Sequence, residues 1–342
     1  MAIPCWPSGP GHLSGDSLDE AKQVWQKNSF NLTPNVREEL AQSDSEKTRC
    51  YGRPLIEVND LHFSYEGEIE ALRGVSLRIR EGEFVAILGQ NGSGKTTLAK
   101  HLNGLLKPTQ GEALIEGTST SHMSAGELGR HVGYVFQNPD HQIFEETILD
   151  EVLFGPRNLG LDSDRVQEQA RDALETVGLW ERRSEDPFTL TKGLRQKVAV
   201  ASVLATRPRA IIMDEPTTGL DYGELKQMMT LVKRLNEAGH TIIIITHCIW
   251  IAAEFAHRTI LVSEGKVVAD GPTREVFSHE DLLAQADIIA PQIVRFSNEL
   301  GTTILSVEEF LKCVRPIINL DADPENANWL REMRDKQTQS ET

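Results

Sequence analysis

Short, almost continuously apolar runs alternate along the chain with stretches of helical periodicity. The runs that predict strands, by their length and their β-branched side chains, are Phe84–Leu88, 132–136, 210–213 and Thr241–Ile245. Helices are predicted over residues 96–105, 165–177 and 195–205. Strands that are apolar on both faces and alternate with helices are typical of a parallel sheet covered by helices on both sides, so the predicted fold class is α/β.

The same pattern divides the chain into segments. Residues 1–53 are rich in Pro, Gly, Ser, Asn and charge, which predicts a poorly ordered N-terminal extension. Residues 54–278 hold the alternating strands and helices, and within them residues from about 138 to 206 show helical patterns without a convincing strand, which predicts a helical insertion. Residues 279–320 predict a small helical domain, and residues 321–342 a mostly disordered tail.

Two local signals mark helices in the small C-terminal domain. Pro291 is suited to open one helix, because proline is favoured at the first helical position. Ser306 and Glu309 have the spacing of a capping box just ahead of Phe310, which predicts the start of a second helix.

Charge and composition argue against several classes of function. The formal net charge of −16 argues against nucleic acid or an anionic lipid surface as the main partner, since both are bound mainly by an excess of Lys and Arg. The four cysteines form no CxxC pair, so neither a disulfide framework nor a zinc site is expected. No apolar run approaches the roughly 18 residues that span a bilayer, and no signal peptide is expected at the amino terminus. A role at a membrane therefore requires a partner.

A phosphate-binding loop follows the first of the predicted strands. Residues 89–96 read GQNGSGKT, which fits G-x-x-x-x-G-K-[ST] between a predicted strand and a predicted helix. Backbone N–H groups of such a loop surround phosphate oxygens, and the helix N-terminus adds positive potential. Lys95 is expected to reach the β- and γ-phosphates of ATP, and the Thr96 hydroxyl to bind Mg²⁺. The predicted nucleotide-binding residues of this segment are Gly89, Gln90, Asn91, Gly92, Ser93, Gly94, Lys95, Thr96 and Thr97.

Two carboxylates end another apolar run. Asp214 and Glu215 follow it at the edge of the sheet where open α/β folds bind ligands. Asp214 is expected to hold Mg²⁺, and Glu215 to orient and polarise the attacking water. Phosphoryl transfer needs little beyond positioning and charge neutralisation, so the loop and this pair together predict ATP hydrolysis.

Polar residues follow two further strands. Gln137 comes after residues 132–136, and His247 comes two residues after Ile245. Each alone is more often an ordinary loop residue than a catalytic one. Parallel strands, however, bring both to the same edge near the γ-phosphate. Gln137, Glu215 and His247 are therefore predicted as catalytic residues. Thr96, Gln137 and Asp214 are predicted as the metal site.

Together these residues resemble the ABC (ATP-binding cassette) ATPases from about residue 55 to residue 277. In that resemblance residues 89–96 look like Walker A, Gln137 the Q-loop, residues 211–215 Walker B, residues 219–221 with Asp221 the D-loop, and His247 the H-loop. Tyr65 looks like the aromatic residue that stacks on adenine. The resemblance implies a P-loop NTPase core of mainly parallel sheet with an antiparallel β subdomain, a helical insertion and a small C-terminal helical domain.

Longer segments narrow the resemblance to the ATPases of energy-coupling-factor importers, which take up vitamins, cobalt or nickel. They are HLNGLLKPTQGE, VGYVFQNPDHQIFEETILDEVLFGPRNLGL and MDEPTTGLD, with EVFSHEDLL and PQIVRFSNELG nearer the C-terminus. Membership implies a second ABC ATPase subunit, in either a homodimer or a heterodimer, together with a transmembrane coupling protein and a small membrane substrate-binding protein. It also implies a peripheral location on the cytoplasmic face of the cell membrane, with the segment after Gln137 contacting the coupling protein.

One segment departs from the family. The family's signature is Leu-Ser-Gly-Gly-Gln, whereas this chain has Leu190 followed by Thr191, Lys192, Gly193 and Leu194. In ABC dimers this helix start faces the γ-phosphate held by the other subunit. Lys192 stands where the family has a glycine and adds a charged side chain where space is tight. Leu194 stands where the family has glutamine, so a side-chain amide that could bond the nucleotide is lost. Two readings stay open: a slower composite site, or a lysine that supplies useful positive charge.

Two other function classes remain as alternatives to transport. One is an ABC-type ATPase acting on nucleic acid or ribosomes, which the strong negative charge and the single cassette argue against. The other is a regulatory subunit that binds ATP with weak turnover. The presence of Lys95, Asp214, Glu215 and His247 argues against it, whereas the altered signature keeps it open for the partner's site.

Overall fold

The computed structural model describes residues 51–65, 69–299 and 301–314 of the 342-residue chain. These residues fall into two compact units. The larger contains the described residues up to Val276 together with Asp281–Ile288, and the smaller contains Phe277–Glu280 and the described residues from Ile289 onward. The predictions of a poorly ordered extension and of a C-terminal tail fall almost wholly outside the described residues.

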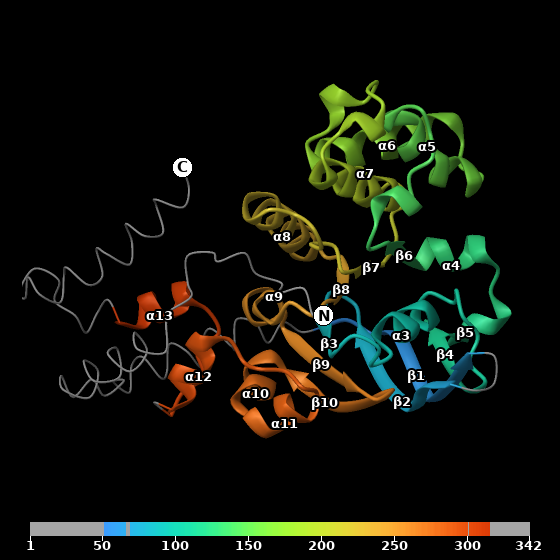
Figure 1. Ribbon diagram of the computed structural model, residues 1–342. Coiled ribbons are helices and arrows are strands. Elements are labelled where there is room, and N and C mark those ends of the chain that lie inside the picture. The colour runs from blue at the N-terminus through green and yellow to red at the C-terminus, as the bar shows by residue number, and fades with distance from the viewer. Residues whose placement is uncertain (1–50, 66–68, 300, 315–342) are drawn as a thin grey trace, which may run out of the picture. The chain divides into compact units, whose positions relative to one another are not determined.

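A six-stranded sheet forms the centre of the larger unit (Figure 1). Its strand order is β10-β9-β3-β8-β7-β6, with bounds β3 Phe84–Leu88, β6 Val132–Val135, β7 Ala210–Asp214, β8 Thr241–Ile245, β9 Arg258–Ser263 and β10 Lys266–Pro272. All neighbours pair in parallel except β9 with β10, which are antiparallel. The four strands predicted from apolar runs are confirmed as β3, β6, β7 and β8, and all four are buried along their whole length.

A second sheet is antiparallel, with order β2-β1-β4-β5. Its strands are β1 Pro54–Tyr65, β2 Ile69–Arg80, β4 Gln110–Ile115 and β5 Thr118–Ser119. Burial alternates along much of β1, as expected of a strand with one face in a core. Leu61 and Leu72 of this sheet share one apolar cluster with Ile87 and Ile245 of the parallel sheet and with Leu98. The two sheets are therefore held by one common core.

Helices cover the parallel sheet on either side. The predicted helix at residues 96–105 is α3, Lys95–Leu102, which starts directly at the phosphate loop. The others are α4 Ala125–His131, α8 Tyr222–Glu237 and α9 Ile249–Phe255, with a 3₁₀ turn η1 at Thr120–His122. The buried residues of α8 include Met228, Leu231 and Leu235, which gives one apolar face at helical spacing.

The segment predicted to be a helical insertion forms helices only, among the residues described. Its elements are α5 Ile148–Asn158, α6 Ser163–Val177, α7 Lys192–Leu204 and the 3₁₀ turns η2 Pro139–His141, η3 Trp180–Arg182 and η4 Pro187–Thr189. The three α-helices pack against one another and form a group of their own in Figure 1. Each starts at a side-chain cap, which is Thr147, Asp162 or Thr191.

Short helices complete the described chain: α10 Thr273–Ser278, α11 Glu280–Gln285, α12 Gln292–Glu299 and α13 Val307–Val314. Helix α12 follows Pro291, as predicted. The capping box is confirmed only in half. Ser306 Oγ accepts the Glu309 N–H at 3.1 Å, but the Glu309 carboxylate accepts from the N–H of Leu305 at 2.8 Å, not from that of Ser306. Among the described residues no helix is long and apolar enough to cross a membrane.

Candidate functional site

The predicted site residues come together at the carboxyl edge of the parallel sheet. Strands β3, β8, β7 and β6 are consecutive neighbours, and each runs into a loop at this edge. Gly89 follows β3 and His247 follows β8. Asp214 ends β7 and is followed by Glu215, and Gln137 comes shortly after β6. The carboxyl ends of parallel strands are where α/β folds place ligands. The strand order puts the phosphate loop and the acids at this same edge, with only β8 between their strands.

The phosphate loop has a backbone that requires glycine. A turn closes with the Ser93 N–H donating to the Gln90 carbonyl at 3.1 Å. Gly92 and Gly94 have φ of 84° and 103°, in the left-handed region. A Cβ on Gly94 would also lie 2.6 Å from the carbonyl oxygen of Ala71 in β2. The loop is thus fixed by close approach of the antiparallel sheet.

Lys95 is held inside the loop. Its Nζ donates to the carbonyls of Gly89 at 2.8 Å and Gln90 at 2.7 Å, and the side chain is buried. Burial lowers the pKa of Lys95, and the nearby charges of Glu215 and Asp214 oppose this effect. Ser93 Oγ is buried without a hydrogen-bond partner among the described residues. A buried hydroxyl without a partner, in the same loop as a buried ammonium group, is suited to a phosphate oxygen.

Asp214 links three elements. Its Oδ1 accepts from the Thr96 hydroxyl of α3 at 3.3 Å, and its Oδ2 accepts from the Tyr134 hydroxyl of β6 at 2.8 Å. Burial raises the pKa of Asp214, and the hydrogen bonds from Tyr134 and Thr96 lower it.

This oxygen pair fits Mg²⁺. Hydroxyl and carboxylate oxygens are the ligands that Mg²⁺ prefers, and it commonly takes one or two of them together with phosphate and water. No group of three His, Cys, Asp or Glu residues that could hold a metal ion occurs in the part of the chain that the structure describes. Thr96 and Asp214 are the residues that would hold the ion.

Glu215 and His247 form a close pair. Glu215 Oε1 lies 2.6 Å from His247 Nδ1 and accepts the His247 backbone N–H at 3.0 Å. The other carboxylate oxygen lies 3.4 Å from the Thr246 hydroxyl. Glu215 has φ of 47°, a conformation that costs a non-glycine residue about 1–3 kcal/mol and that clusters at functional sites. The hydrogen bond to Glu215 raises the pKa of His247.

Two predicted residues are less closely tied to this centre. Gln137 is exposed, and no hydrogen bond between described residues joins it to Asp214, Glu215 or His247. Tyr65 is 43% exposed, and its hydroxyl lies 3.2 Å from Thr97 Oγ1 beside the phosphate loop. An exposed ring next to the loop is suitable for stacking on a base.

The altered signature segment contacts the following helix of its own chain. Thr191 caps α7 and donates its hydroxyl to Glu224 Oε1 at 3.1 Å. Lys192 extends over Gly219, where an added Cβ would lie 2.7 Å from Nζ. Asp221 caps α8 by accepting from the Glu224 N–H at 2.7 Å. The start of α7 and the start of α8 are therefore joined within one subunit.

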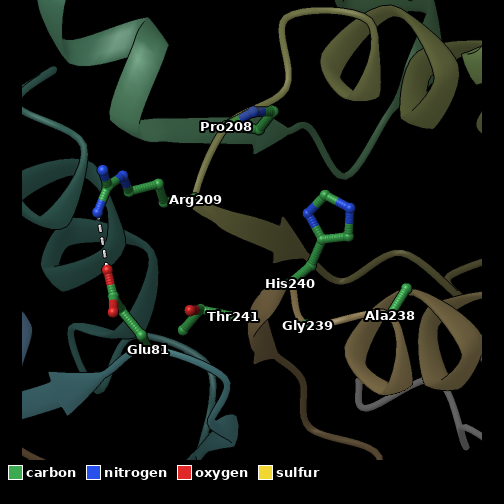
Figure 2. Close-up of a pocket in the computed structure, with 7 residues that line it drawn as sticks. All are labelled: Glu81, Pro208, Arg209, Ala238, Gly239, His240 and Thr241. Carbon is green, nitrogen blue, oxygen red and sulfur yellow. Dashed lines mark hydrogen bonds and ion pairs between the residues drawn. The ribbon is translucent and has the colours of Figure 1, made fainter. Parts of the chain in front are cut away.

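A pocket of about 350 Å³ lies at the opposite edge of the sheet (Figure 2). Its lining includes Arg209 just before β7 and His240 just before β8. The Arg209 guanidinium donates to Glu81 at 2.8 Å and to Glu116 at 2.9 Å, so its charge is already compensated. The pocket is at the amino ends of the strands and is separate from the site described above.

Sequence reasoning missed two contributors to the site. Tyr134 was counted only as part of a strand, although a hydroxyl in an otherwise apolar run two residues before its end is a usable signal. Glu224 gave no signal at all, because its contact with Thr191 joins two helix starts that are distant in the sequence.

The comparisons with known proteins agree with this geometry. A sequence profile described as ABC transporter matches residues 72–218. An ABC transporter ATP-binding protein of Pyrococcus horikoshii is 42% identical over 261 residues, which cover 76% of this chain and 99% of that protein. One from Caldanaerobacter subterraneus subsp. tengcongensis is 48% identical over 299 residues, which cover 87% of this chain and 52% of the relative. The chain thus spans about half the length of the first curated relatives that it matches, with 44% for one from Methanosarcina acetivorans.

Solved structures that resemble this chain also belong to ABC transporters. CbiO1 from Clostridium perfringens, part of the ABC transporter complex CbiONQ, has a TM-score of 0.62 and 33% identity, covering 72% of this chain and 98% of that one. The cassette MJ0796, a dimer in a post-hydrolysis state bound to ADP and Pi, has a TM-score of 0.58 and 33% identity, covering 64% of this chain and 99% of that one. The chain belongs to the ATP-binding proteins of ABC transporters. The cassettes of this family are ATPases coupled to transport.

Proposed function

We propose that this chain binds and hydrolyses Mg-ATP as the ATPase subunit of an energy-coupling-factor importer. The observation that carries the proposal is the convergence of Lys95, Thr96, Asp214, Glu215 and His247 at one sheet edge. Lys95 binds the phosphates, and Thr96 and Asp214 would hold a Mg²⁺ ion whose charge would neutralise that of the phosphate oxygens. Glu215 orients the attacking water and accepts its proton. His247 fixes one oxygen of Glu215 and so leaves the second for the water.

The remaining predicted residues complete the proposed site. Tyr65 stacks on adenine, Gln137 completes the metal and water environment, and Asp221 with residues 191–194 faces the nucleotide of a second ABC ATPase subunit. The dimer of MJ0796 with ADP and Pi supports a paired arrangement. ATP binding closes the pair, and hydrolysis reopens it.

The proposed membrane partners are a transmembrane coupling protein and a small substrate-binding membrane protein. The importer would take up cobalt, nickel or a vitamin, with this chain peripheral on the cytoplasmic face. The structural similarity to CbiO1 of the CbiONQ complex supports the assignment to this type of importer. An exposed aromatic pair shortly after Gln137 supports it as well: Phe144 and Phe154 are 56% and 41% exposed, with ring centroids 4.6 Å apart. Exposed paired aromatics are typical of interaction surfaces.

Phosphate release by the purified chain tests the ATPase proposal. Glu215→Gln should lower turnover by roughly 100-fold or more, the scale of general-base catalysis, and should leave nucleotide binding intact. With ATP the variant should form stable dimers, visible by light scattering. Failure of the wild-type protein to bind ATP would overturn the proposal. Phe144→Ser with Phe154→Ser should keep ATP binding and lose co-purification with the coupling protein.

The altered signature favours a second candidate, a regulatory subunit with weak turnover at the partner's site. Lys192→Gly combined with Leu194→Gln restores the family pattern at these two positions. A higher ATPase rate of the assembled complex would support an impaired composite site. A lower rate would support Lys192 as a contributor of charge, and an unchanged rate would remove the impaired-site idea.

A further inference from the structure

Tyr134 is a buried tyrosine whose hydroxyl points at the acid of the metal site. It lies in β6, in register with Ile212 of β7, and is 9% exposed. Its hydroxyl donates to Asp214 Oδ2 at 2.8 Å. The ring packs edge-on against Phe136 with centroids 5.0 Å apart, and it belongs to the apolar core cluster. The hydroxyl is therefore carried by a rigid, well-packed ring.

The two oxygens of Asp214 have separate partners. Thr96 Oγ1 lies 3.3 Å from Oδ1 on one side, and Tyr134 holds Oδ2 on the other. A carboxylate fixed at one oxygen cannot rotate freely about its Cβ–Cγ bond. Oδ1 is thereby kept toward the phosphate-loop helix, on the side where the nucleotide's cation would sit.

We infer that Tyr134 is a positioning residue of the nucleotide site, which fixes Asp214 so that Oδ1 and the Thr96 hydroxyl bind the nucleotide's divalent cation together. This inference rests on the proposed Mg-ATP function and deepens it. In this role Tyr134 acts through Asp214, to which its hydroxyl is bonded. Groups that orient metal ligands in this way typically change metal affinity or activity by about 10- to 100-fold when removed.

Burial supports the donor role of the hydroxyl. The phenol is the donor in its bond to Asp214 Oδ2, and its side chain is almost fully buried, so water does not compete for that bond. Asp214 is the acceptor in the pair, as a metal-binding carboxylate must be.

The alternative is that Tyr134 only fills the core and uses Asp214 as a convenient hydrogen-bond partner. That view predicts lower stability for Tyr134→Phe and an unchanged response to Mg²⁺. The two views therefore differ in one measurable quantity, the free Mg²⁺ concentration at half-maximal Mg²⁺-dependent nucleotide binding.

The experiment titrates Mg²⁺ into the full chain with a fluorescent ATP analogue at fixed concentration. Tyr134→Phe should raise the half-saturating Mg²⁺ concentration roughly 10-fold or more and leave nucleotide binding in EDTA unchanged. Asp214→Asn is the reference for loss of the ligand. Tyr222→Phe, which removes a hydroxyl from a tyrosine that is 51% exposed, is the matched control and should behave like wild type.

An unchanged half-saturating Mg²⁺ concentration in a folded Tyr134→Phe variant would overturn the inference and leave the proposed function standing. Absence of nucleotide binding in the wild-type protein would instead overturn the proposed function. Should Tyr134→Phe fail to fold, para-aminophenylalanine at position 134 keeps a weaker donor on the same ring. It should shift the Mg²⁺ response in the same direction by a smaller factor, and no shift would overturn the inference.

Discussion

The Thr191 hydroxyl donates to the Glu224 carboxylate across the starts of α7 and α8, at 3.1 Å. The same carboxylate lies against Gly193, where an added Cβ would be 2.7 Å from its Oε1. A negative side chain is thus seated on the first turn of α7. That turn would otherwise offer its N–H groups and positive potential to a phosphate.

Removal of this charge should strengthen ATP-dependent pairing. In the Glu215→Gln background, Glu224→Gln should lower the ATP concentration needed for half-maximal dimer formation by about 2- to 5-fold, since a charge at a helix start is worth roughly 0.3–1 kcal/mol. Glu237→Gln at the far end of α8 removes the same charge from the same helix and is the control. If both variants lower this ATP concentration equally, the lower net charge alone explains the change.

The sequence predicted the parts of this fold that depend on local pattern. Strand β8 reads TIIII and is buried along its whole length, and a short β-branched run of this kind is typical of the centre of a parallel sheet. Strand β9 was missed, since its apolar stretch begins and ends with the polar residues Arg258 and Ser263. Helix α7 was placed three residues too late, because its start at Lys192 depends on the cap by Thr191.

The site was predictable in its residue types but not in its pairings. Lys95, Asp214 and Glu215 stand in recognisable motifs. The hydrogen bond between Tyr134 and Asp214 joins residues 80 positions apart, and the pattern of apolar and polar residues cannot predict such a contact. The neighbours that orient a catalytic group become visible only when the strand order is known.

The pair of His247 and Glu215 should make stability depend on pH. The folded pKa of His247 is raised above its ordinary value of 6.5 by the hydrogen bond to Glu215. The contribution of the imidazolium is therefore complete below about pH 6.5 and is lost as the pH rises through the folded pKa. The melting temperature of wild type relative to His247→Gln should be higher at pH 6 than at pH 9, without nucleotide. A constant difference would contradict the assignment.

Arg258 compensates a buried acid. Glu83 is 4% exposed, and Arg258 donates to its Oε2 at 3.0 Å and to both oxygens of Asp270. Arg258→Ala should lower the free energy of unfolding by about 3–5 kcal/mol, because an uncompensated charge stays buried. Burial raises the pKa of Glu83, so the loss should shrink as the pH falls and the carboxyl takes a proton.

Denaturant unfolding of the double variant checks this cause. Glu83→Gln added to Arg258→Ala should recover part of the lost stability, since no buried charge remains. If the second substitution adds a further loss of similar size, packing of the Arg258 side chain is the main contribution instead.

Alanine substitutions at two glycines of the phosphate loop distinguish the cost of backbone strain from the cost of a steric clash. Gly92→Ala and Gly94→Ala both place a side chain at positive φ, which costs about 1–2 kcal/mol each. A Cβ at Gly92 meets nothing within 4 Å, whereas at Gly94 it meets the Ala71 carbonyl at 2.6 Å. Gly94→Ala should therefore lose clearly more stability in thermal unfolding. Equal losses would show that the contact with β2 relaxes freely.

The strand order also determines when the site can form during synthesis. Strand β3 carries the phosphate loop, yet its two neighbours are β8 and β9, which lie far later in the chain. In a nascent chain that has emerged only to residue 240, the phosphate loop follows a strand, β3, that has neither of its sheet neighbours. Such distant pairing slows folding and leaves apolar strands uncovered meanwhile. The strand that carries the early-translated loop therefore gains its second sheet neighbour only once β9, which ends at Ser263, has been made.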